Sequence, residues 1–281
     1  MKNFAVIAVL LLVAVCYVGV RHYLDVADYN SSIVLRVGVE CDYPPNNWEE
    51  KKFSSSNVPL INQEGFYADG YDIQIAKIAA KSIGAKLEFK KIAWDDLIPA
   101  LNKNEIDVIF SGMLDTSARK ELIAFTESYE ARRTEYAAVV QKSGRWSDAK
   151  NLTDFKGARF VAQVSSNFEA AIKQLPGAIL LPSVETPNEM LEAVLNNNAD
   201  GLITDLSIAQ RYANEHPELK IIRFPKNATF VFDYSGICAG VRKSDEKLLK
   251  DLNKVFEELS LEERQTIMDQ AIGRNMNDIN F

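Results

Sequence analysis

Apolar segments with two different periods alternate along the chain after about residue 33. Residues 35–39 and 108–110 are short apolar runs, which are typical of strands. Between them, residues 72–84 have apolar side chains at helical spacing, and we expect this helix to be capped by Asp72 and ended by Gly84. The first part of the chain therefore predicts strands connected by helices.

The same rhythm continues to the end of the chain. Further strands are expected at 87–89, 159–162, 202–204, 221–224 and 236–241, and further helices at 94–103, 168–175, 190–196, 208–215 and 248–256. Residues 49–65 contain three consecutive serines and are expected to form a long loop. Alternating strands and helices favour the α/β class, with parallel sheet covered by helices on both faces.

The N-terminus has a different pattern. A short basic start precedes an unbroken apolar run over residues 4–20, which is typical of an export signal. The run approaches the length of a membrane span, so residues 1–30 are interpreted as either a signal peptide or an uncleaved anchor. Lipidation at Cys16 stays open, although the preceding Leu12-Val13-Ala14-Val15 puts a bulky Val where a small residue is preferred. The rest of the chain is expected to be an extracytoplasmic body.

Composition and charge exclude several function classes. The chain has 281 residues, 47% of them hydrophobic, and 32 Lys and Arg against 39 Asp and Glu give a net charge of -7. Because no basic stripe is present, a nucleic-acid partner is not expected. Only His22 and His216 are available, so we expect no metal and no cofactor. Export would permit a disulfide between Cys41 and Cys238, but each could equally be a buried apolar residue.

Candidate functional residues come from the turns that follow the strands, because open α/β sheets bind ligands beyond the carboxyl ends of their strands. Four such turns carry polar or aromatic side chains, and a tryptophan begins the helix predicted at 94–103. The candidates are Glu40, Tyr43 and Trp48, then Trp94, then Ser111, Gly112, Met113 and Arg119, then Gln163, Ser165, Ser166 and Asn167, and finally Asp205.

These turns, in this order, resemble the polar amino-acid branch of the solute-binding proteins that serve ABC importers. The matching stretches lie at 35–38, 43–45, 70–73, 94–101, 106–109, 111–113, 123–126, 152–157, 201–205 and 240–243. Each stretch alone is a weak signal, but their combination covers roughly residues 33–257 and is specific. The chain is therefore identified as a member of that family.

The resemblance implies two Rossmann-like α/β lobes joined by a two-strand hinge, the type II periplasmic-binding-protein fold. The first lobe would contain residues 31–130 and 231–281, and the second would contain 131–230. A ligand would be held between lobes that close on it. The implied partners are a free amino acid and the ABC-importer permease in the membrane, and the implied state is a monomer without enzymatic activity.

By the family's pattern, Arg119 pairs with the α-carboxylate of the ligand and Asp205 receives its α-ammonium group. The turn over residues 165–167 adds donors to the carboxylate, while Tyr43 and Trp94 wall the site. The chemistry agrees, since a guanidinium fork suits a carboxylate.

Each candidate also has a plainer interpretation. Arg119 could be a solvated surface charge, Asp205 could cap the helix that follows it, and Ser166 and Asn167 could do no more than cap another helix. Tyr43, Trp48 and Trp94 could be core aromatics. These alternatives stay open at the level of sequence.

The sequence departs from the family's pattern at three positions near the expected ligand. Leu114 stands where a Ser or Thr hydroxyl is usual, Ser165 replaces a Gly and Asn167 replaces a Thr. These changes bear on ligand identity more than on fold. Glu40 follows the first strand, where the resembling proteins place an acidic residue that faces the ligand side chain. We therefore expect a polar ligand, with a cationic amino acid ahead of glutamine. The alternatives are an exported enzyme similar to cyclohexadienyl dehydratase and a membrane-anchored sensor domain.

Overall fold

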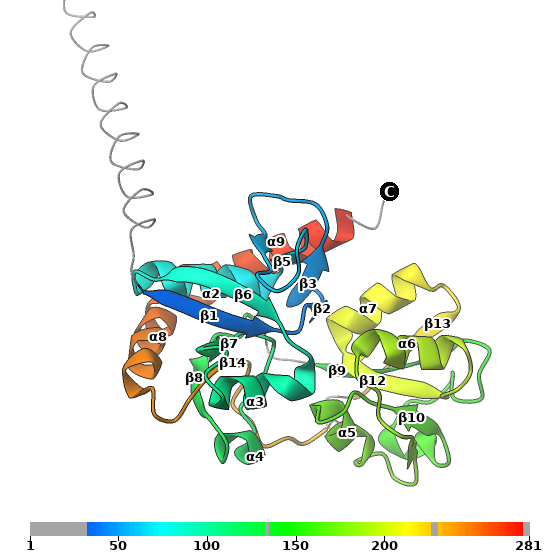
Figure 1. The fold of residues 1–281 in the computed structure, drawn as a ribbon. Coiled ribbons are helices and arrows are strands. Elements are labelled where there is room, and N and C mark those ends of the chain that lie inside the picture. Colours follow the sequence, from blue (N-terminus) through cyan, green and yellow to red (C-terminus); the bar gives the residue numbers. More distant parts are fainter. Residues whose placement is uncertain (1–32, 133–134, 226–229, 278–281) are drawn as a thin grey trace, which may run out of the picture.

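The computed structural model describes residues 33–132, 135–225 and 230–277 (Figure 1). The predictions for residues 1–30, including Cys16, lie outside the described residues. In the described ranges, no helix combines the length and the apolar character that a membrane crossing requires.

The first lobe is built on a mixed five-stranded sheet with the order β6-β1-β7-β14-β8. Its strands are β1 (Val34–Val39), β6 (Lys86–Lys91), β7 (Val108–Ile109), β8 (Ala124–Ser128) and β14 (Cys238–Val241). β1 is parallel to both of its neighbours, whereas β14 is antiparallel to both of its own. The expectation of a purely parallel sheet is therefore wrong, because β14 enters this lobe from the opposite direction.

The second lobe has its own five-stranded sheet, with the order β11-β10-β12-β9-β13. The strands are β9 (Tyr136–Gln141), β10 (Arg159–Val161), β11 (Ile179–Leu180), β12 (Gly201–Asp205) and β13 (Leu219–Arg223). Here β9 is antiparallel to β12 and to β13. Around this sheet lie η2 (Leu152–Phe155), α5 (Asn167–Ile172), α6 (Pro187–Leu195) and α7 (Leu206–Glu215).

The chain crosses between the two lobes after β8 and again after β13 (Figure 1). The expected two α/β lobes are thus confirmed, whereas the predicted two-strand hinge falls partly outside the described residues. Because each sheet has helices on its faces, each lobe can fold around a separate core, and the carboxyl ends of several strands meet between the lobes.

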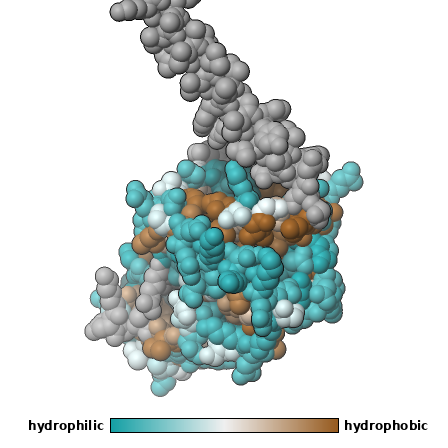
Figure 2. Space-filling model, turned by 90° about the vertical axis from the view of Figure 1, so that its left-hand side faces the viewer, coloured by the Kyte–Doolittle hydropathy of each residue, from teal (hydrophilic) through white to brown (hydrophobic). Residues whose placement is uncertain are grey.

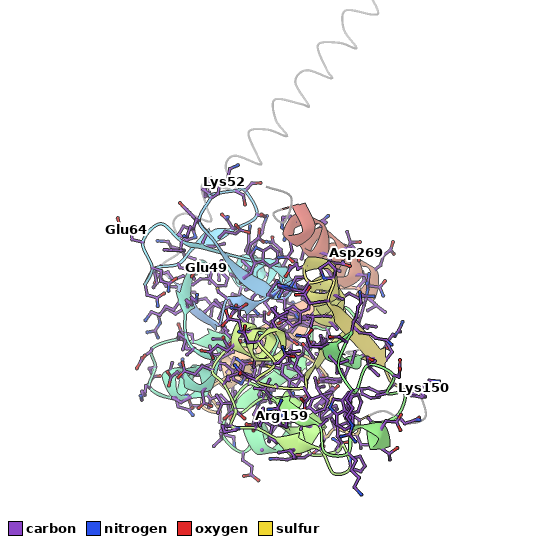
Figure 3. The ribbon with its side chains drawn as sticks, turned by 90° about the vertical axis from the view of Figure 1, so that its right-hand side faces the viewer. Glu49, Lys52, Glu64, Lys150, Arg159 and Asp269 are labelled. Atoms are coloured by element: carbon purple, nitrogen blue, oxygen red, sulfur yellow. The ribbon has the colours of Figure 1, made fainter. Side chains whose placement is uncertain are left out.

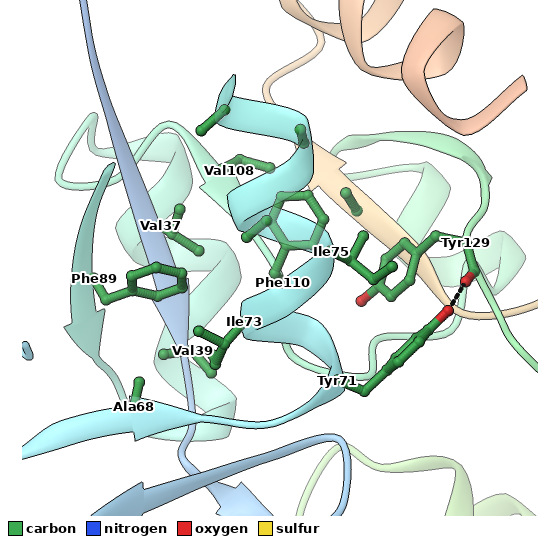
Figure 4. Packing of buried hydrophobic residues seen from close by; sticks show 14 of the residues in the cluster. Val37, Val39, Ala68, Tyr71, Ile73, Ile75, Phe89, Val108, Phe110 and Tyr129 are labelled. Atoms are coloured by element: carbon green, nitrogen blue, oxygen red, sulfur yellow. Dashed lines mark hydrogen bonds between the residues drawn. The ribbon is translucent and has the colours of Figure 1, made fainter. Parts of the chain in front are cut away.

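Helices cover both faces of the first sheet. They are α2 (Tyr71–Ser82), η1 (Trp94–Asp96), α3 (Leu97–Asn102), α4 (Ser117–Lys120), α8 (Glu246–Glu258) and α9 (Leu261–Asn277). Val108 packs in the cluster under α2 and α8, whereas its neighbour Ile109 packs under α3. This is the two-residue alternation expected of a strand buried on both sides. Figure 4 shows Ile73 of α2 beside Val39 of β1, and Ile75 on the side of α2 that faces Tyr129.

Part of the predicted long loop is a small antiparallel sheet with the order β2-β3-β5-β4. Its strands are β2 (Asp42–Tyr43), β3 (Asn47–Glu50), β4 (Val58–Pro59) and β5 (Tyr67–Asp69). Within the predicted loop over residues 49–65, residues 49–50 and 58–59 belong to strands of this sheet, so the loop prediction is wrong there and confirmed for residues 51–57. Strands of two to four residues are too short to show a period in the sequence.

Two further predictions are settled by local geometry. The cap of α2 is Gly70, and Asp72 does not cap the helix, since its carboxylate is buried and bonded elsewhere. Gly70 is required there because its φ is 130° and its backbone packs against the turn that precedes β3. Cys41 and Cys238 are both buried and free, so the alternative of two buried apolar residues holds.

Hydrophilic residues dominate the face of the molecule in Figure 2. The face in Figure 2 has apolar residues in a band across its upper part, with hydrophilic residues over much of the rest. Large exposed apolar side chains come from separate elements, among them Phe53, Leu122 and Val231. Scattered residues of this kind are normal in globular proteins.

We predict that Gly70→Ala lowers the free energy of unfolding by at least about 3 kcal/mol. A Cβ at this position would overlap the carbonyl oxygen of Asn46 and lie 2.7 Å from the Cα of Asn47. Gly84→Ala is the matched control, because its φ is 66° and nothing lies near the new Cβ, so it should cost about 1 kcal/mol. Urea unfolding measures both, and equal losses would contradict this account.

Candidate functional site

A cavity lies between the two lobes at the carboxyl ends of their strands. The residues that line it include most of the candidates from the sequence: Glu40, Tyr43, Trp94, Ser111, Gly112, Leu114, Tyr136, Gln163, Ser166, Asn167, Phe168, Asp205 and Ile237. Both lobes and both crossing regions contribute, so neither lobe alone completes this site.

Glu40 occupies the first-lobe wall, directly after β1, and is 5% exposed. Its backbone N–H donates to the hydroxyl of Ser111 over 3.0 Å, which ties the turn after β1 to the turn after β7. Across the cleft, Nε2 of Gln163 donates to Oε1 of Glu40 over 2.5 Å and to the carbonyl of Glu185. Burial raises the pKa of Glu40 to about 8, although the Gln163 bond opposes this shift.

Asp205 is on the opposite wall, where β12 gives way to α7. It stands at the N-cap position of α7, yet its side chain makes no capping hydrogen bond. Instead, one carboxylate oxygen accepts the hydroxyl of Tyr43 from the other lobe. Its Oδ1 is buried without a hydrogen-bond partner among the described residues. Burial raises the pKa of Asp205 to about 7. Helix capping does not hold this carboxylate in place, because the side chain makes no capping hydrogen bond.

Arg119 is buried beside the cavity on α4, whose N-cap Thr116 accepts the Arg119 backbone N–H. The guanidinium donates to the carbonyls of Leu114, at 2.8 Å, and Ser165, at 3.0 Å, and it lies 5.0 Å from the ring of Trp94. In the described ranges, no carboxylate pairs with it. Burial lowers the pKa of Arg119 to about 10, and the surface-charge alternative does not fit this environment.

The turn after β10 supplies the second lobe's polar groups. Ser165 has a φ of 54°, and its carbonyl also accepts the indole N–H of Trp94 at 3.5 Å. Ser166 caps α5, because its hydroxyl accepts the N–H of Phe168 and donates to the carbonyl of Gln163. Asn167 is the first residue of that helix. Ser166 therefore both caps a helix and lines the cavity.

Four candidates do not line the cavity: Arg119 and Ser165 lie beside it, whereas Trp48 and Met113 face the core of the first lobe. Trp48 packs in the core of the first lobe and donates its indole N–H to Glu50. Met113 packs under α3, and its carbonyl accepts the N–H of Cys238. Because side chains alternate along extended backbone, a residue in the right turn can still face the core.

The structure also adds lining residues that the sequence did not single out, Tyr136, Phe168 and Ile237, and it places Leu114 in the lining as the sequence suggested. Tyr136 and Ile237 lie at or just after the crossing segments, where no strand-end turn draws attention to them. The ring of Tyr136 is 6.2 Å from that of Phe168, so together they form an aromatic floor. The only signal in the sequence would have been an aromatic residue beside a crossing segment, as Tyr136 is.

Comparison with known proteins identifies the family. The model of the family described as bacterial extracellular solute-binding proteins, family 3, matches residues 35–274. The chain belongs to this family. Its members are extracytoplasmic binding proteins of ABC importers.

Individual relatives agree with the family. The chain is 26% identical over 230 residues to a probable histidine-binding protein of Neisseria gonorrhoeae, covering 82% of this chain and 79% of that protein. It is 25% identical to ABC transporter arginine-binding protein 1 of Escherichia coli K12, covering 79% and 83%. A solved structure of an ancestral arginine-binding protein bound to arginine is 28% identical, with a TM-score of 0.68 and coverage of 84% and 97%.

The charged groups of this cavity predict a pH effect on stability. A carboxyl whose pKa is raised in the folded state binds its proton more tightly there, so it contributes stability at low pH that is lost as pH rises. For Glu40 this loss should run from about pH 4.5 to about pH 8. In the ligand-free protein, the change in unfolding free energy caused by Glu40→Gln should therefore be more stabilising at pH 9 than at pH 5, by about 2–4 kcal/mol.

Urea unfolding at both pH values measures this difference. The control is Glu64→Gln, because Glu64 is exposed and lies on the outside of the first lobe (Figure 3). A stabilisation by Glu40→Gln that is the same at pH 5 and pH 9 would show that the carboxyl is ionised at both.

Proposed function

We propose that the protein captures an amino acid between its two lobes and delivers it to an ABC importer, and that the amino acid has a cationic side chain. The single observation that carries the proposal is the set of buried charges at the cavity. Glu40 and Asp205 line the cavity and Arg119 lies beside it, against Trp94, and no ion pair joins the three to each other or to another described side chain.

The balance of these charges favours a basic amino acid. Two carboxylates and one guanidinium leave one net negative charge when all three groups are ionised. An amino acid with a cationic side chain has two positive groups and one negative group, so it complements the site group for group. A glutamate ligand would add a second negative charge beside Glu40, and like-charge repulsion should reject it.

In this proposal, Arg119 exchanges the Ser165 carbonyl for the α-carboxylate of the ligand, and Oδ1 of Asp205 receives the α-ammonium group. The side chain then extends between Tyr43 and Trp94 toward Glu40. Ser111 and Gly112 shape the first-lobe wall, while Gln163, Ser166 and Asn167 shape the second. The relatives named for binding histidine and arginine support the same ligand class.

We also propose that the lobes divide as the sequence suggests, with residues 31–130 and 231–281 in the first and 131–230 in the second. The two sheets draw their strands from these segments, which supports the division. Closure of the lobes would follow from ligand contacts to both walls. The protein would act as an extracytoplasmic monomer beside its permease, with an export signal or an anchor at its N-terminus.

The function itself is tested by a thermal-shift screen against the common L- and D-amino acids. A ligand that binds only the folded state stabilises it, by about 2.7 kcal/mol at a hundred times Kd. We expect arginine, lysine or histidine to give the largest shifts, with glutamine behind them. A screen that returns only glutamate, aspartate or a small aliphatic amino acid would contradict the proposed ligand.

We predict that Arg119→Ala weakens binding of the amino acid by roughly thirtyfold to several thousandfold, because it removes one partner of a desolvated charge pair. Titration calorimetry measures the change. Arg223→Ala is the matched control, since Arg223 is exposed on β13 and pairs with Glu135. If Arg119→Ala binds as tightly as the control, Arg119 does not hold the ligand.

Glu40→Gln should change selectivity rather than binding in general. The variant should bind arginine roughly tenfold to a hundredfold more weakly, because a buried charge pair is lost. Its affinity for glutamine should stay close to that of the wild type, since the substitution keeps the shape of the site. An unchanged preference between arginine and glutamine would remove Glu40 from the specificity pocket.

An exported dehydratase-like enzyme remains a second candidate for one reason. Glu40 has a pKa near 8 and could act as a proton donor at neutral pH. Such a reaction also needs a base placed against the substrate, whereas the Glu40 carboxyl is engaged by Gln163. Incubation with cyclic amino-acid precursors separates the two functions, because an enzyme would turn them over and a binding protein would return them unchanged.

A further inference from the structure

A buried aspartate lies behind the cavity and connects the turns that shape its first-lobe wall. Asp72, the second residue of α2, is fully buried and does not line the cavity. Its Oδ1 accepts the hydroxyl of Tyr129 at 2.7 Å, and its Oδ2 accepts Nδ2 of Asn47 at 2.8 Å. It also accepts the backbone N–H of Gly112. Figure 4 shows Tyr129 beside the start of α2.

Asn47 links Asp72 to the turn after β1 through hydrogen bonds. It is also fully buried, and its Oδ1 accepts the backbone N–H of Cys41 at 2.8 Å. Cys41 has a φ of 60°, a conformation that non-glycine residues rarely adopt and that needs support from its surroundings. The hydrogen bonds from Asp72 to Asn47 and from Asn47 to Cys41 therefore hold the backbone immediately after Glu40.

The turn over residues 111–112 holds the other side of Glu40, and the same turn is bonded to Asp72 through the N–H of Gly112. The N–H of Glu40 donates to the hydroxyl of Ser111, which precedes Gly112. Gly112 has a φ of 61°, and a Cβ there would press on the ring of Tyr43. The turn after β1 and the turn after β7, which together place Glu40, are thus both connected to the buried carboxylate of Asp72.

Only an acceptor fits at position 72. Asn47 already uses its oxygen for Cys41 and must direct its amide donors toward Asp72. An amide at position 72 replaces one of the two acceptor oxygens with a donor, so it cannot accept from Asn47, Tyr129 and Gly112 as the carboxylate does, and Asn47 could not turn over without withdrawing its oxygen from Cys41. An unpaired buried donor is costly, so the turn after β1 would shift to relieve it. Burial raises the pKa of Asp72 to about 7.

We propose that Asp72, acting through Asn47, is a positioning residue that fixes the place of the Glu40 carboxylate and thereby sets the preference for a cationic ligand side chain. The inference rests on the proposed function, because it concerns how the same cavity selects its ligand.

The experiment is a cycle of Asp72→Asn, Asn47→Asp and the double variant, with titration of arginine and glutamine. In Asp72→Asn one of the two acceptor oxygens becomes a donor, so the contacts of position 72 with Asn47, Tyr129 and Gly112 cannot all be kept, and in Asn47→Asp two carboxylate oxygens face each other. Each single variant should reduce the ratio of arginine to glutamine affinity by roughly tenfold. The double variant should return to within about threefold of the wild-type ratio. The reason is that its carboxylate at position 47 can accept both from the amide at position 72 and from the N–H of Cys41.

The affinity ratio separates positioning from simple support of the core. Tyr129→Phe is the matched control, since it removes a hydrogen bond to Asp72 that does not lead to Cys41. It should lower the unfolding temperature and leave the ratio unchanged. Hydrogen exchange at the Cys41 amide should be faster in Asp72→Asn and slow again in the double variant, which is a readout without ligand.

The possible results distinguish two failures. If the wild-type protein binds no amino acid, the proposed function fails and this inference fails with it. If the wild type binds but the double variant keeps the low ratio of Asp72→Asn, or if Asp72→Asn only lowers the unfolding temperature, this inference alone is wrong. Should Asn47→Asp not fold, Asp72→Asn and the double variant still decide the question.

Discussion

The constraint on which this structure depends is the withdrawal from water of Glu40 and Asp205 in one cleft and of Arg119 beside it, without an ion pair for any of them among the described residues. Desolvation of an unpaired charge is costly and favours the neutral form of each group. It raises the pKa of Glu40 and Asp205 and lowers the pKa of Arg119. The hydroxyl of Tyr43, the amide of Gln163 and two carbonyls offset only part of that cost. A zwitterion with a second positive charge would supply the missing partners.

The architecture tolerates such a cleft because the cores lie elsewhere. Each lobe buries its own apolar cluster around its own sheet, and the cleft lies at the strand ends between them. The charged groups come from short turns anchored at both ends by buried strands and helices. Stability is therefore supplied by the lobes, while the turns can hold groups that destabilise the ligand-free protein.

The sequence was informative where a long periodic segment or a strand-end turn was present. The helix at 72–84, the turns bearing Glu40, Arg119 and Asp205, and the two-lobe class could all be predicted from it. The antiparallel β9 and β14 could not, because strand direction depends on where the chain crosses between lobes. Short strands such as β4 carry no period at all.

Side-chain direction was the other limit. Trp48 lies in an informative turn yet faces the core, whereas Tyr136 lines the cavity from a strand with no polar signal. Asp72 carries the N-cap residue type, but a positive φ at Gly70 shifts the start of α2 and leaves the carboxylate in the interior. Such outcomes depend on tertiary contacts that no local pattern encodes.

A crystal structure of the protein with bound arginine tests the central claim most directly. The account predicts the α-carboxylate on Arg119, the α-ammonium group on Oδ1 of Asp205 and the guanidinium group against Glu40, with both lobes in contact with one ligand molecule. An arginine bound outside this cleft, or one in the cleft that leaves Arg119 on the Ser165 carbonyl and Oδ1 of Asp205 without a partner, would contradict it.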